Sequence, residues 1–439
     1  MKEPRTPGNK CAALATPESP WIFHAKLLGA SHEFLAQKKV IVKVLQEALK
    51  FFVIVQYIVL GIAAIPFIYY LLALYSTARF FSATKRSAAN IDFLPPISCL
   101  KPIKGLDEDA YDNYASFCRQ DYPEYEIVFC VDRDDPALPL LEKLVREFPE
   151  RKIRLLFSSG RNAINDKCGR LYRLTNEAAY DIFVITDGDV RVGPDYLRTV
   201  VSPFRDPKVG AATCLYASTE ETNFVQELQS IGMISDFFAP VMVAWQLDDL
   251  NVTFGQTIVT TRKAVTAYGG YQVLENRPAD DVYAGRLVAE QGFEVKLLPY
   301  IVQSVADFKS MSDLLHKRTR WMTVQRLMRP WGHLGLIFTF GLPWALLAVA
   351  IHPTAAIAIA YLGGYAVCRV AITWMIGARG MKQSGLWKKM PLIPLWDAIA
   401  FGMWLASFGR RTIRWRGVDY FLRDGKLVSA KQAPASAQS

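Results

Sequence analysis

Two aspartates, Asp187 and Asp189, closely follow the short apolar run 182–185 of this 439-residue sequence. The run is typical of an interior β-strand, and Gly188 between the acids allows a turn. Residues two apart in an extended chain point to the same side, so the two carboxylates would lie close together and repel. The pair therefore predicts a bound Mg²⁺ or Mn²⁺, since both ions prefer oxygen ligands. An aspartate beside glycine is also common in a plain turn, and the pair alone leaves that alternative open.

Further charged residues stand at the ends of other predicted elements. Asp132 closes the strand pattern 125–132, where a carboxylate can accept hydrogen bonds from a ribose hydroxyl or a base N–H. Asp280 and Asp281 open an amphipathic helix, so they either cap that helix or supply a general base for an acceptor hydroxyl. Lys167 opens another helix and is either a surface lysine or a contact for a phosphate.

Residues 316–331 combine basic and aromatic side chains at helical spacing. The guanidinium of Arg320 suits a diphosphate leaving group, because it can form two parallel hydrogen bonds. The indole of Trp321 suits the wall of a sugar or acyl site. A basic, aromatic helix is also typical of a membrane surface, so the pattern alone leaves both interpretations open.

The elements that must position these residues alternate between strand and helix patterns from residue 97 to residue 305. The strand patterns cover 97–105, 125–132, 152–158, 181–189 and 209–217. A helical pattern at 167–180 separates two of them. This alternation predicts an α/β domain with a largely parallel sheet, whose ligands bind beyond the carboxyl ends of the strands. Because Asp132 and the pair at 187–189 both stand at that edge, the sequence predicts one common crevice.

The regions outside this domain are membrane-like in composition. Hydrophobic residues make up 51% of the chain, and the mean hydropathy is +0.13. The uncharged run 51–75 is long enough to span about 30 Å of hydrocarbon. Segments 335–352 and 354–376 predict a transmembrane hairpin, whereas 392–408 has basic loops on both sides and predicts a re-entrant or interfacial segment. The net charge of +10 is concentrated beside these segments, which indicates contact with a lipid bilayer and argues against nucleic acid binding.

The chain is therefore expected to divide into five parts. These are a disordered and amphipathic segment 1–50, a transmembrane helix 51–75, a catalytic domain 90–330 with interfacial helices, a membrane region 333–420 and a polar tail 421–439. The membrane region would hold the transmembrane hairpin and a re-entrant or third membrane segment. Within the first part, residues 1–25 are expected to be disordered and the lysine-rich run 25–50 to lie along the membrane surface. The apolar stretch 237–247 predicts either a core helix or a segment in the headgroup layer beside an acyl-chain entrance.

An ordered set of motifs resembles the membrane glycosyltransferases of the ceramide glucosyltransferase family. The motifs are SCLKPIKGLDED (98–109), EIVFCVDRDDPAL (126–138), ITDGDVRVGPDYL (185–197), FGQTIVTTR (254–262), PADDVYAGRL (278–287), RTRW (318–321) and WRG (415–417). The resemblance covers about residues 51–420. It implies a GT-A fold, which is Rossmann-like and binds nucleotide-diphospho-sugars, with transmembrane helices at both ends.

The resemblance also implies roles for the residues that bind the sugar donor. Asp132 would contact the nucleotide of a UDP-sugar. Asp187 and Asp189 would hold Mg²⁺ or Mn²⁺ on its diphosphate, and Lys167 would lie beside the phosphates.

On the catalytic side, the resemblance makes Asp281 the base that removes the acceptor proton, with Asp280 as a rival for that role. Arg320 and Trp321 match the end of the family's (Q/R)xxRW motif. The first position of that motif is Lys317 here, which keeps a cation but loses the planar or amide hydrogen bonding of the usual residue.

The implied reaction is an inverting, metal-dependent transfer of a sugar, with glucose from UDP-glucose as the leading case, to a hydroxyl of a membrane lipid such as ceramide. Nucleotide sugars are cytosolic. We therefore expect an integral protein of a bacterial inner membrane with its catalytic domain on the cytoplasmic face. Two alternatives remain: a processive polysaccharide synthase with the same acids, and a non-catalytic membrane scaffold that keeps the fold.

Overall fold

The structure is a computed structural model that describes residues 20–87, 93–107, 109–158, 163–219, 221–247, 250–305, 308–415 and 418–430. The chain divides into two units, residues 1–62 and residues 63–439. Residues 1–19, for which we predict disorder, lie outside the described residues, as do residues 431–439 of the predicted polar tail and positions 416–417 of the WRG motif.

The first unit contains most of the long helix α1 (Pro20–Ala63). Residues 20–25 are helical, so the predicted disorder of 1–25 is wrong for them. Pro20 suits the first helical position, where its missing N–H has no partner to lose. The second unit begins with α2 (Ile65–Ser87), and Ala64 separates the two helices.

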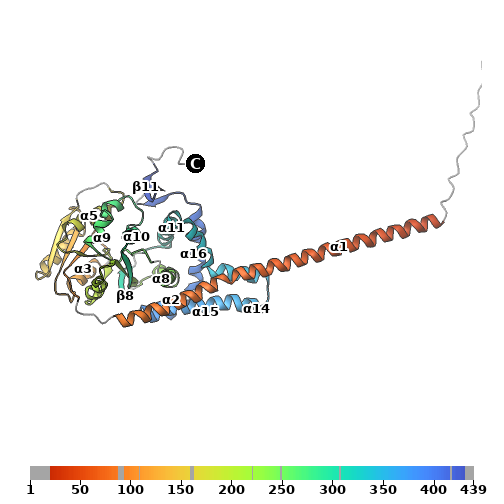
Figure 1. Ribbon diagram of the computed structural model, residues 1–439, viewed down its shortest axis with the longest axis horizontal. Coiled ribbons are helices and arrows are strands. Elements are labelled where there is room, and N and C mark those ends of the chain that lie inside the picture. Colours follow the sequence, from red (N-terminus) through yellow and green to blue (C-terminus); the bar gives the residue numbers. More distant parts are fainter. Residues whose placement is uncertain are drawn as a thin grey trace, which may run out of the picture. The chain divides into compact units, whose positions relative to one another are not determined.

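An eight-stranded sheet in the order β3-β2-β1-β4-β7-β6-β8-β5 forms the centre of the second unit (Figure 1). Its strands are β1 (Ile97–Pro102), β2 (Tyr125–Val131), β3 (Lys152–Phe157), β4 (Ile182–Ile185), β5 (Val190–Arg191), β6 (Val209–Thr219), β7 (Ile258–Thr261) and β8 (Glu294–Val305). The first four are parallel, β6 and β8 are parallel to each other, and β7 and β5 run against their neighbours. The sheet is thus mixed, and the predicted α/β class is confirmed.

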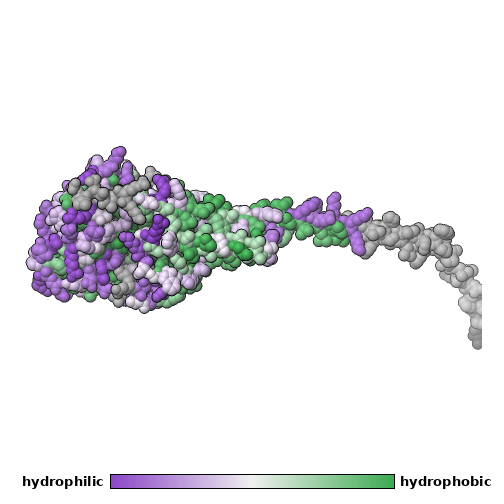
Figure 2. Space-filling model, turned by 90° about the horizontal axis from the view of Figure 1, so that it is seen from below, coloured by the Kyte–Doolittle hydropathy of each residue, from purple (hydrophilic) through white to green (hydrophobic). Residues whose placement is uncertain are grey.

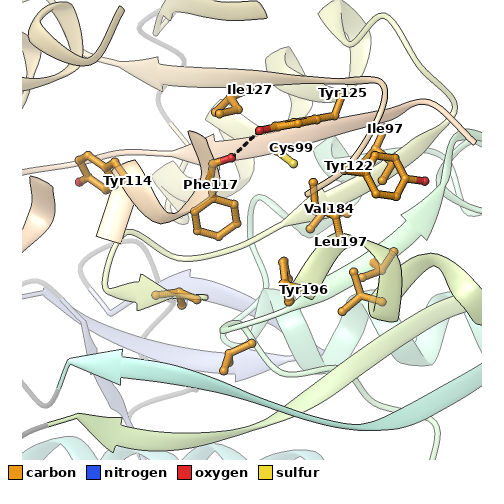
Figure 3. Close-up of a cluster of buried hydrophobic side chains, with 14 of the residues drawn as sticks. Ile97, Cys99, Tyr114, Phe117, Tyr122, Tyr125, Ile127, Val184, Tyr196 and Leu197 are labelled. Atoms are coloured by element: carbon orange, nitrogen blue, oxygen red, sulfur yellow. Dashed lines mark hydrogen bonds between the residues drawn. The ribbon is translucent and has the colours of Figure 1, made fainter. Parts of the chain in front are cut away.

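Alternate residues of the strands face two different helical layers. On one side Ile127 and Phe129 of β2 join a core with α3 (Ala110–Cys118), α4 (Leu138–Glu147) and α6 (Tyr196–Val201). Figure 3 shows part of this core, in which the Tyr125 hydroxyl donates to the Phe117 carbonyl at 3.0 Å.

On the other side Val128 of the same strand packs with α5 (Asp166–Glu177), α9 (Arg262–Ala267) and α10 (Asp280–Glu290). Burial on both faces explains why β2 and β4 are uninterrupted apolar runs, which made them easy to predict.

The strand patterns did not include β7 or β8. β7 has only four residues, IVTT. β8 contains Pro299, and the pairing partner moves from Leu298 opposite Cys214 to Ile301 opposite Leu215. A bulge of this kind interrupts the alternation of faces and accommodates a proline, so the sequence reads as two short fragments.

The remaining helices form a largely apolar bundle. They are α7 (Phe224–Gly232), η2 (Met233–Phe237), α8 (Phe238–Gln246), α11 (Met311–Met328), α12 (Pro330–Gly335), η4 (Leu336–Phe338), α13 (Gly341–Ile351), α14 (Ala355–Ala358), η5 (Ile359–Gly363), α15 (Gly364–Thr373), η6 (Trp374–Gly380) and α16 (Ile393–Phe408). Short 3₁₀ turns lie at η1 (Ser202–Arg205), η3 (Tyr271–Leu274), η7 (Leu386–Lys388) and η8 (Met390–Leu392).

Among the described residues, four helices are long and apolar enough to cross a membrane. They are Ile41–Ala83, Phe224–Gln246, Ala355–Gly380 and Leu386–Phe408, and a fifth would be the pair Pro330–Phe338 and Gly341–Ile351, which is bent by 49°. In the second unit hydrophobic side chains gather over these helices, away from the hydrophilic surface of the sheet domain (Figure 2). These features indicate an integral membrane protein.

The structure refines the membrane segments expected from the sequence. The bend lies within the predicted segment 335–352, whereas 392–408 forms the single helix α16. The apolar stretch 237–247 belongs to the helix Phe224–Gln246 except for its last residue. The most apolar part of this helix is 67% buried inside the protein, in keeping with a core helix. Whether each segment spans the bilayer stays a prediction.

The C-terminal part ends in a small antiparallel sheet of β9 (Ile413–Trp415), β10 (Val418–Arg423) and β11 (Lys426–Ser429). The expected polar tail 421–439 therefore includes strand residues up to Ser429. Asp424 and Gly425 both have positive φ angles, 49° and 72°, which close a tight hairpin. Leu427 is then buried, and its burial holds β11 in place.

Candidate active site

The loop after β4 carries Asp187 and Asp189, the two predicted metal-binding aspartates. Asp189 accepts a hydrogen bond at 2.8 Å from the hydroxyl of Ser304, which lies on β8 beside β5. A methyl group on Gly188 would stand 2.7 Å from Asp107 Oδ2, so only glycine allows this close approach. The loop is therefore pinned at the carboxyl end of β4, where the sequence places it.

A lysine that sequence reasoning missed supports the same loop. Lys101 is the last residue but one of β1. Its side chain is fully buried, and its Nζ donates to the Asp187 carbonyl at 3.1 Å. The ammonium also lies 3.8 Å from the centre of the Phe117 ring. Burial lowers the pKa of Lys101 to about 8, although Asp189 and Asp187 oppose this shift. Its signal in the sequence was a single lysine inside an otherwise apolar strand.

Asp281 lies in the first turn of α10 and faces the loop before β7. Its Oδ2 accepts a hydrogen bond at 3.1 Å from the N–H of Gly255, and its Oδ1 accepts one at 2.8 Å from Val282. The Thr253 hydroxyl donates to the carbonyl of the same aspartate at 2.7 Å. Desolvation and then the neighbouring Asp280 raise the pKa of Asp281 to about 6, against the pull of Lys167.

Lys167 joins the two groups of acids. Its Nζ lies 2.6 Å from Asp187 Oδ1 and 3.2 Å from Asp280 Oδ2. A methyl group on Gly255 would stand 2.8 Å from Asp187 Oδ2 and 3.6 Å from Asp281 Oδ2, so the backbone of this glycine separates them. The structure thus brings four predicted residues, Asp187, Lys167, Asp280 and Asp281, into one cluster.

Asp132 lies at the end of β2, where Arg170 Nη2 forms an ion pair with it. Nη1 of this buried arginine lies 2.6 Å from Asp166 Oδ2, which also contacts Lys104 Nζ at 2.6 Å. Sequence reasoning missed Arg170 and Asp166. Their i, i+4 spacing at the start of α5 was the available signal. A second patch of paired charges therefore stands at the same edge of the sheet.

The residues of the RW motif lie on α11. Lys317 Nζ contacts Asp313 at 3.4 Å and stands 4.7 Å from the Phe308 ring centre, so these contacts stay in and just before α11. Burial lowers the pKa of Arg320, and Trp321 is 38% exposed. The residue missed here is Arg318, which is buried and donates to Gln229 Oε1 at 2.9 Å.

The chemistry of Asp187 and Asp189 suits an open divalent-metal site. Desolvation and the charge of Asp187 raise the pKa of Asp189 to about 6, and a bound cation would offset both effects. Among the described residues, no three or more His, Cys, Asp or Glu side chains form a group that could hold a metal by themselves. Two carboxylates fit Mg²⁺ or Mn²⁺, because such ions commonly complete their coordination with phosphate oxygens and water.

Comparisons with known proteins agree with this geometry. The sequence model of Glycosyl transferase family 21 matches residues 58–428. Ceramide glucosyltransferase 3 of Caenorhabditis elegans is 22% identical over 239 residues, 54% of this chain and 52% of that protein. The beta-monoglucosyldiacylglycerol synthase of Synechocystis is 27% identical over 210 residues, 46% of this chain and 42% of that protein. The chain spans about half the length of these curated relatives.

A solved structure also resembles the chain. It is a mannosyltransferase from Pyrobaculum calidifontis in complex with GDP-Man and Mn²⁺, with a TM-score of 0.51 and 16% sequence identity. The match covers 79% of this chain and 99% of that chain. This likeness confirms the expected GT-A-like α/β fold.

Proposed function

The chain belongs to glycosyl transferase family 21, and from this premise we propose that it transfers a sugar from a UDP-sugar to a hydroxyl of a membrane lipid. The names of both relatives refer to the transfer or attachment of glucose, so UDP-glucose is the proposed donor. Those names differ in the lipid, which is ceramide in one and diacylglycerol in the other. The proposed acceptor is accordingly a lipid hydroxyl, with ceramide as the first candidate.

The observation that carries the proposal is the direct connection between the acid cluster and the apolar helices. Phe254 precedes Gly255, which binds Asp281, and its ring lies 5.6 Å from Phe237 and 6.3 Å from Tyr216. These rings belong to the same buried core as α2, α13, α15 and α16. A lipid could present its hydroxyl to Asp281 while its chains stay among apolar side chains.

Asp281 is the proposed general base. Its pKa of about 6 leaves it ionised at neutral pH and near the value that suits proton transfer. As the acceptor oxygen attacks the anomeric carbon, the Asp281 carboxylate takes its proton. The bond between the sugar and the diphosphate breaks on the opposite face, so the configuration inverts.

The donor is proposed to lie across the carboxyl ends of β2 and β4. Asp132, beside Arg170, would receive the nucleoside. Asp187 and Asp189 would hold Mg²⁺ or Mn²⁺, which when bound stabilises the negative charge of the departing diphosphate. Lys167 would contribute a further positive charge to the phosphates.

The α11 residues are proposed to contact the other side of the substrates. Arg320 would bind the diphosphate, Trp321 would face the sugar or lipid, and Lys317 would supply a cation nearby. Because nucleotide sugars are cytosolic, the proposal places the α/β domain on the cytoplasmic face of the membrane.

The test uses purified protein in detergent with Mg²⁺ or Mn²⁺, a panel of UDP-sugars, ceramide and diacylglycerol, followed by mass spectrometry of the lipids. We expect one lipid to gain a single hexose from UDP-glucose, with no product after chelation of the metal and far less product in Asp281→Asn. A growing oligosaccharide would instead support a polysaccharide synthase. A folded protein that neither binds UDP-sugars nor forms product would contradict both enzyme functions and support the non-catalytic membrane scaffold.

A further inference from the structure

The small sheet β9–β11, which we call the C-terminal ribbon, contacts several parts of the proposed active site. Its buried residues Ile413 and Leu427 form a separate apolar cluster with Val324 of α11. Ile164 and Ala279 pack against this cluster from the α/β domain. Because these two residues lie just before Lys167 and Asp280, the ribbon reaches the segments that carry the charged cluster.

The contact with the segment before α10 includes the backbone. The N–H of Leu427 donates to the carbonyl of Asn276 at 2.6 Å. This hydrogen bond extends the ribbon onto residues 276–279, which lead directly into Asp280 and Asp281. Leu427 is only 3% exposed, so the apolar side chain and the hydrogen bond fix this segment together.

The hairpin turn of the ribbon also approaches α10 itself. A methyl group on Gly425 would stand 2.9 Å from the Tyr283 hydroxyl and 3.3 Å from Arg277 Nη1. Arg277 in turn stacks on the Tyr283 ring at 4.3 Å. Tyr283 follows Asp281 by two positions. A steric clash at this contact would therefore displace the first turn of α10, which carries the proposed base.

The contact between the ribbon and α10 is narrow. Beside it lies a cleft of about 410 Å³, lined by residues of α10, α11 and the hairpin that include Leu287, Met328 and Leu422. A cleft of this size means that few atoms hold the two elements together at this end. The ribbon therefore acts on α10 through the contact at Gly425 and on the preceding segment through Leu427, rather than through a broad interface.

The ribbon is also tied to the apolar bundle. It follows α16 after a short connection, and the guanidinium of Arg326 on α11 donates to the Arg410 carbonyl in that connection at 2.5 Å. The same element therefore touches the bundle and the segment that holds the base.

We propose that the C-terminal ribbon positions Asp281 for catalysis, with Leu427 and Gly425 as positioning residues that act through residues 276–283. The inference rests on the proposed function. The ribbon touches neither donor nor acceptor in this proposal. Its loss should therefore lower the turnover rate while donor binding is kept, because misplacing a catalytic group by about 1 Å can cost a hundredfold in rate.

The first test is Gly425→Ala, assayed as glucose transfer with saturating lipid and varied UDP-glucose. We expect kcat to fall roughly tenfold or more and KM for UDP-glucose to stay within about twofold. Tyr283→Phe removes the oxygen that the new methyl group would approach. The double variant Gly425→Ala/Tyr283→Phe should therefore recover most of the kcat of Tyr283→Phe alone.

The matched control is Gly385→Ala. Gly385 has a φ of +69°, close to the +72° of Gly425, but a methyl group there would meet nothing within 4 Å. It reproduces the backbone strain of alanine without the contact, and we expect the kcat of the unaltered protein. An equal fall in kcat for both glycine variants would overturn the positioning role.

The second test changes Leu427, a buried residue of the ribbon. Leu427→Ala should lower kcat with UDP binding unchanged, Leu427→Met should restore it, and Val418→Ala at an exposed ribbon position should have no effect. The inference is wrong if folded Leu427→Ala has the same kcat as the unaltered protein. It is also wrong if the fall in kcat is accompanied by a loss of both UDP binding and thermal stability. An inactive unaltered protein would instead contradict the proposed function.

Discussion

Two ionic clusters in this protein differ in their balance of charge. In the apolar bundle, the buried guanidinium of Arg369 meets the buried carboxylate of Asp397, with Nε donating to Oδ2 at 2.8 Å. The Tyr365 hydroxyl donates to the same oxygen at 2.7 Å, and Arg369 also donates to the Ser235 carbonyl. The direct ion pair thus joins one acid to one base, and additional hydrogen bonds satisfy both. The neighbouring Asp236 faces both Arg369 and Arg318, so acids and bases are equal in number here.

At the edge of the sheet the acids outnumber the bases. Lys167 forms ion pairs with Asp187 and Asp280 and also attracts Asp281. Lys101 donates to the Asp187 carbonyl and lies near the carboxylate of Asp189, so two bases face four acids. The pKa values of Asp189 and Asp281 rise to about 6 as a result of desolvation and of each acid's neighbour. In the bundle, the charges of the pair neutralise each other without a ligand. The sheet-edge cluster instead has excess negative charge, which suits a bound cation and a proton taken from a substrate.

The largest expected effect separates the two neighbouring acids of α10. Asp281→Asn should lower kcat by about 10³–10⁴-fold, the upper part of the range for loss of a general base. Asp280→Asn should lower it far less, because Asp280 is held by Asn165 Nδ2 at 3.0 Å and by Lys167 and serves the cluster indirectly. The measurement is initial rate of glycolipid formation at saturating substrates.

The binding of UDP in the presence of Mg²⁺ or Mn²⁺ is the control for both variants. It should persist in Asp281→Asn, since that side chain is assigned to the acceptor. A larger loss of activity in Asp280→Asn would reverse the assignment and make Asp280 the base.

The next effect concerns the ion pair between Arg369 and Asp397, and it is a change in the free energy of unfolding. Arg369→Met should lower the free energy of unfolding by about 3–5 kcal/mol, because it leaves the Asp397 carboxylate buried without its cation. Arg369→Met/Asp397→Leu should recover most of this loss, since an apolar replacement of both partners is often neutral. Unfolding in detergent by a denaturant titration measures the difference. If the single and double variants are equally destabilised, charge balance is not what the pair contributes.

The sequence predicts those parts of the fold that depend on local pattern. Strands such as β2 and β4 are buried on both faces, so their continuous apolar runs are visible without any structure. β8 is hidden by Pro299 and its bulge, and β11 by its polar surroundings. Leu427 joins a core made by Val324 and Ile413, far away in sequence, and no window around residue 427 contains that information.

The same limit explains the predictions for the site. Asp187, Asp189 and Asp281 are visible because each follows or begins a clear element in a recognisable motif. Lys101 and Gly255 matter because strands from different parts of the chain pair beside each other, with Leu100 opposite Ile185 and Ile185 opposite Ile258. Such neighbours follow from tertiary pairing, which one sequence does not display.

A smaller effect tests the crowding within the acid cluster. Gly255→Ala would place a methyl group 2.8 Å from Asp187 Oδ2, so either the loop or the carboxylate must move, at a cost of about 1–3 kcal/mol. We expect kcat/KM to fall roughly tenfold to a hundredfold and the metal concentration for half-maximal activity to rise. Gly402→Ala on α16 is the matched control, because a methyl group there meets nothing within 4 Å. Equal activity of the two variants would show that Gly255 does not limit the approach of Asp187.

The smallest effect is the dependence on pH, and it follows from the charge imbalance. The pKa of Asp281 rises from 3.8 to about 6 on folding, so between these values the folded protein holds a proton that the unfolded chain has lost. This group's contribution to the free energy of unfolding therefore falls as pH rises through that window and is level above it. Activity has the opposite slope, because only the ionised base works, and kcat/KM should fall about tenfold for each pH unit below 6. Since the charge of Asp280 raises the pKa of Asp281, Asp280→Asn should move this acid limb to lower pH, and an unmoved limb would show that the titrating group lies elsewhere.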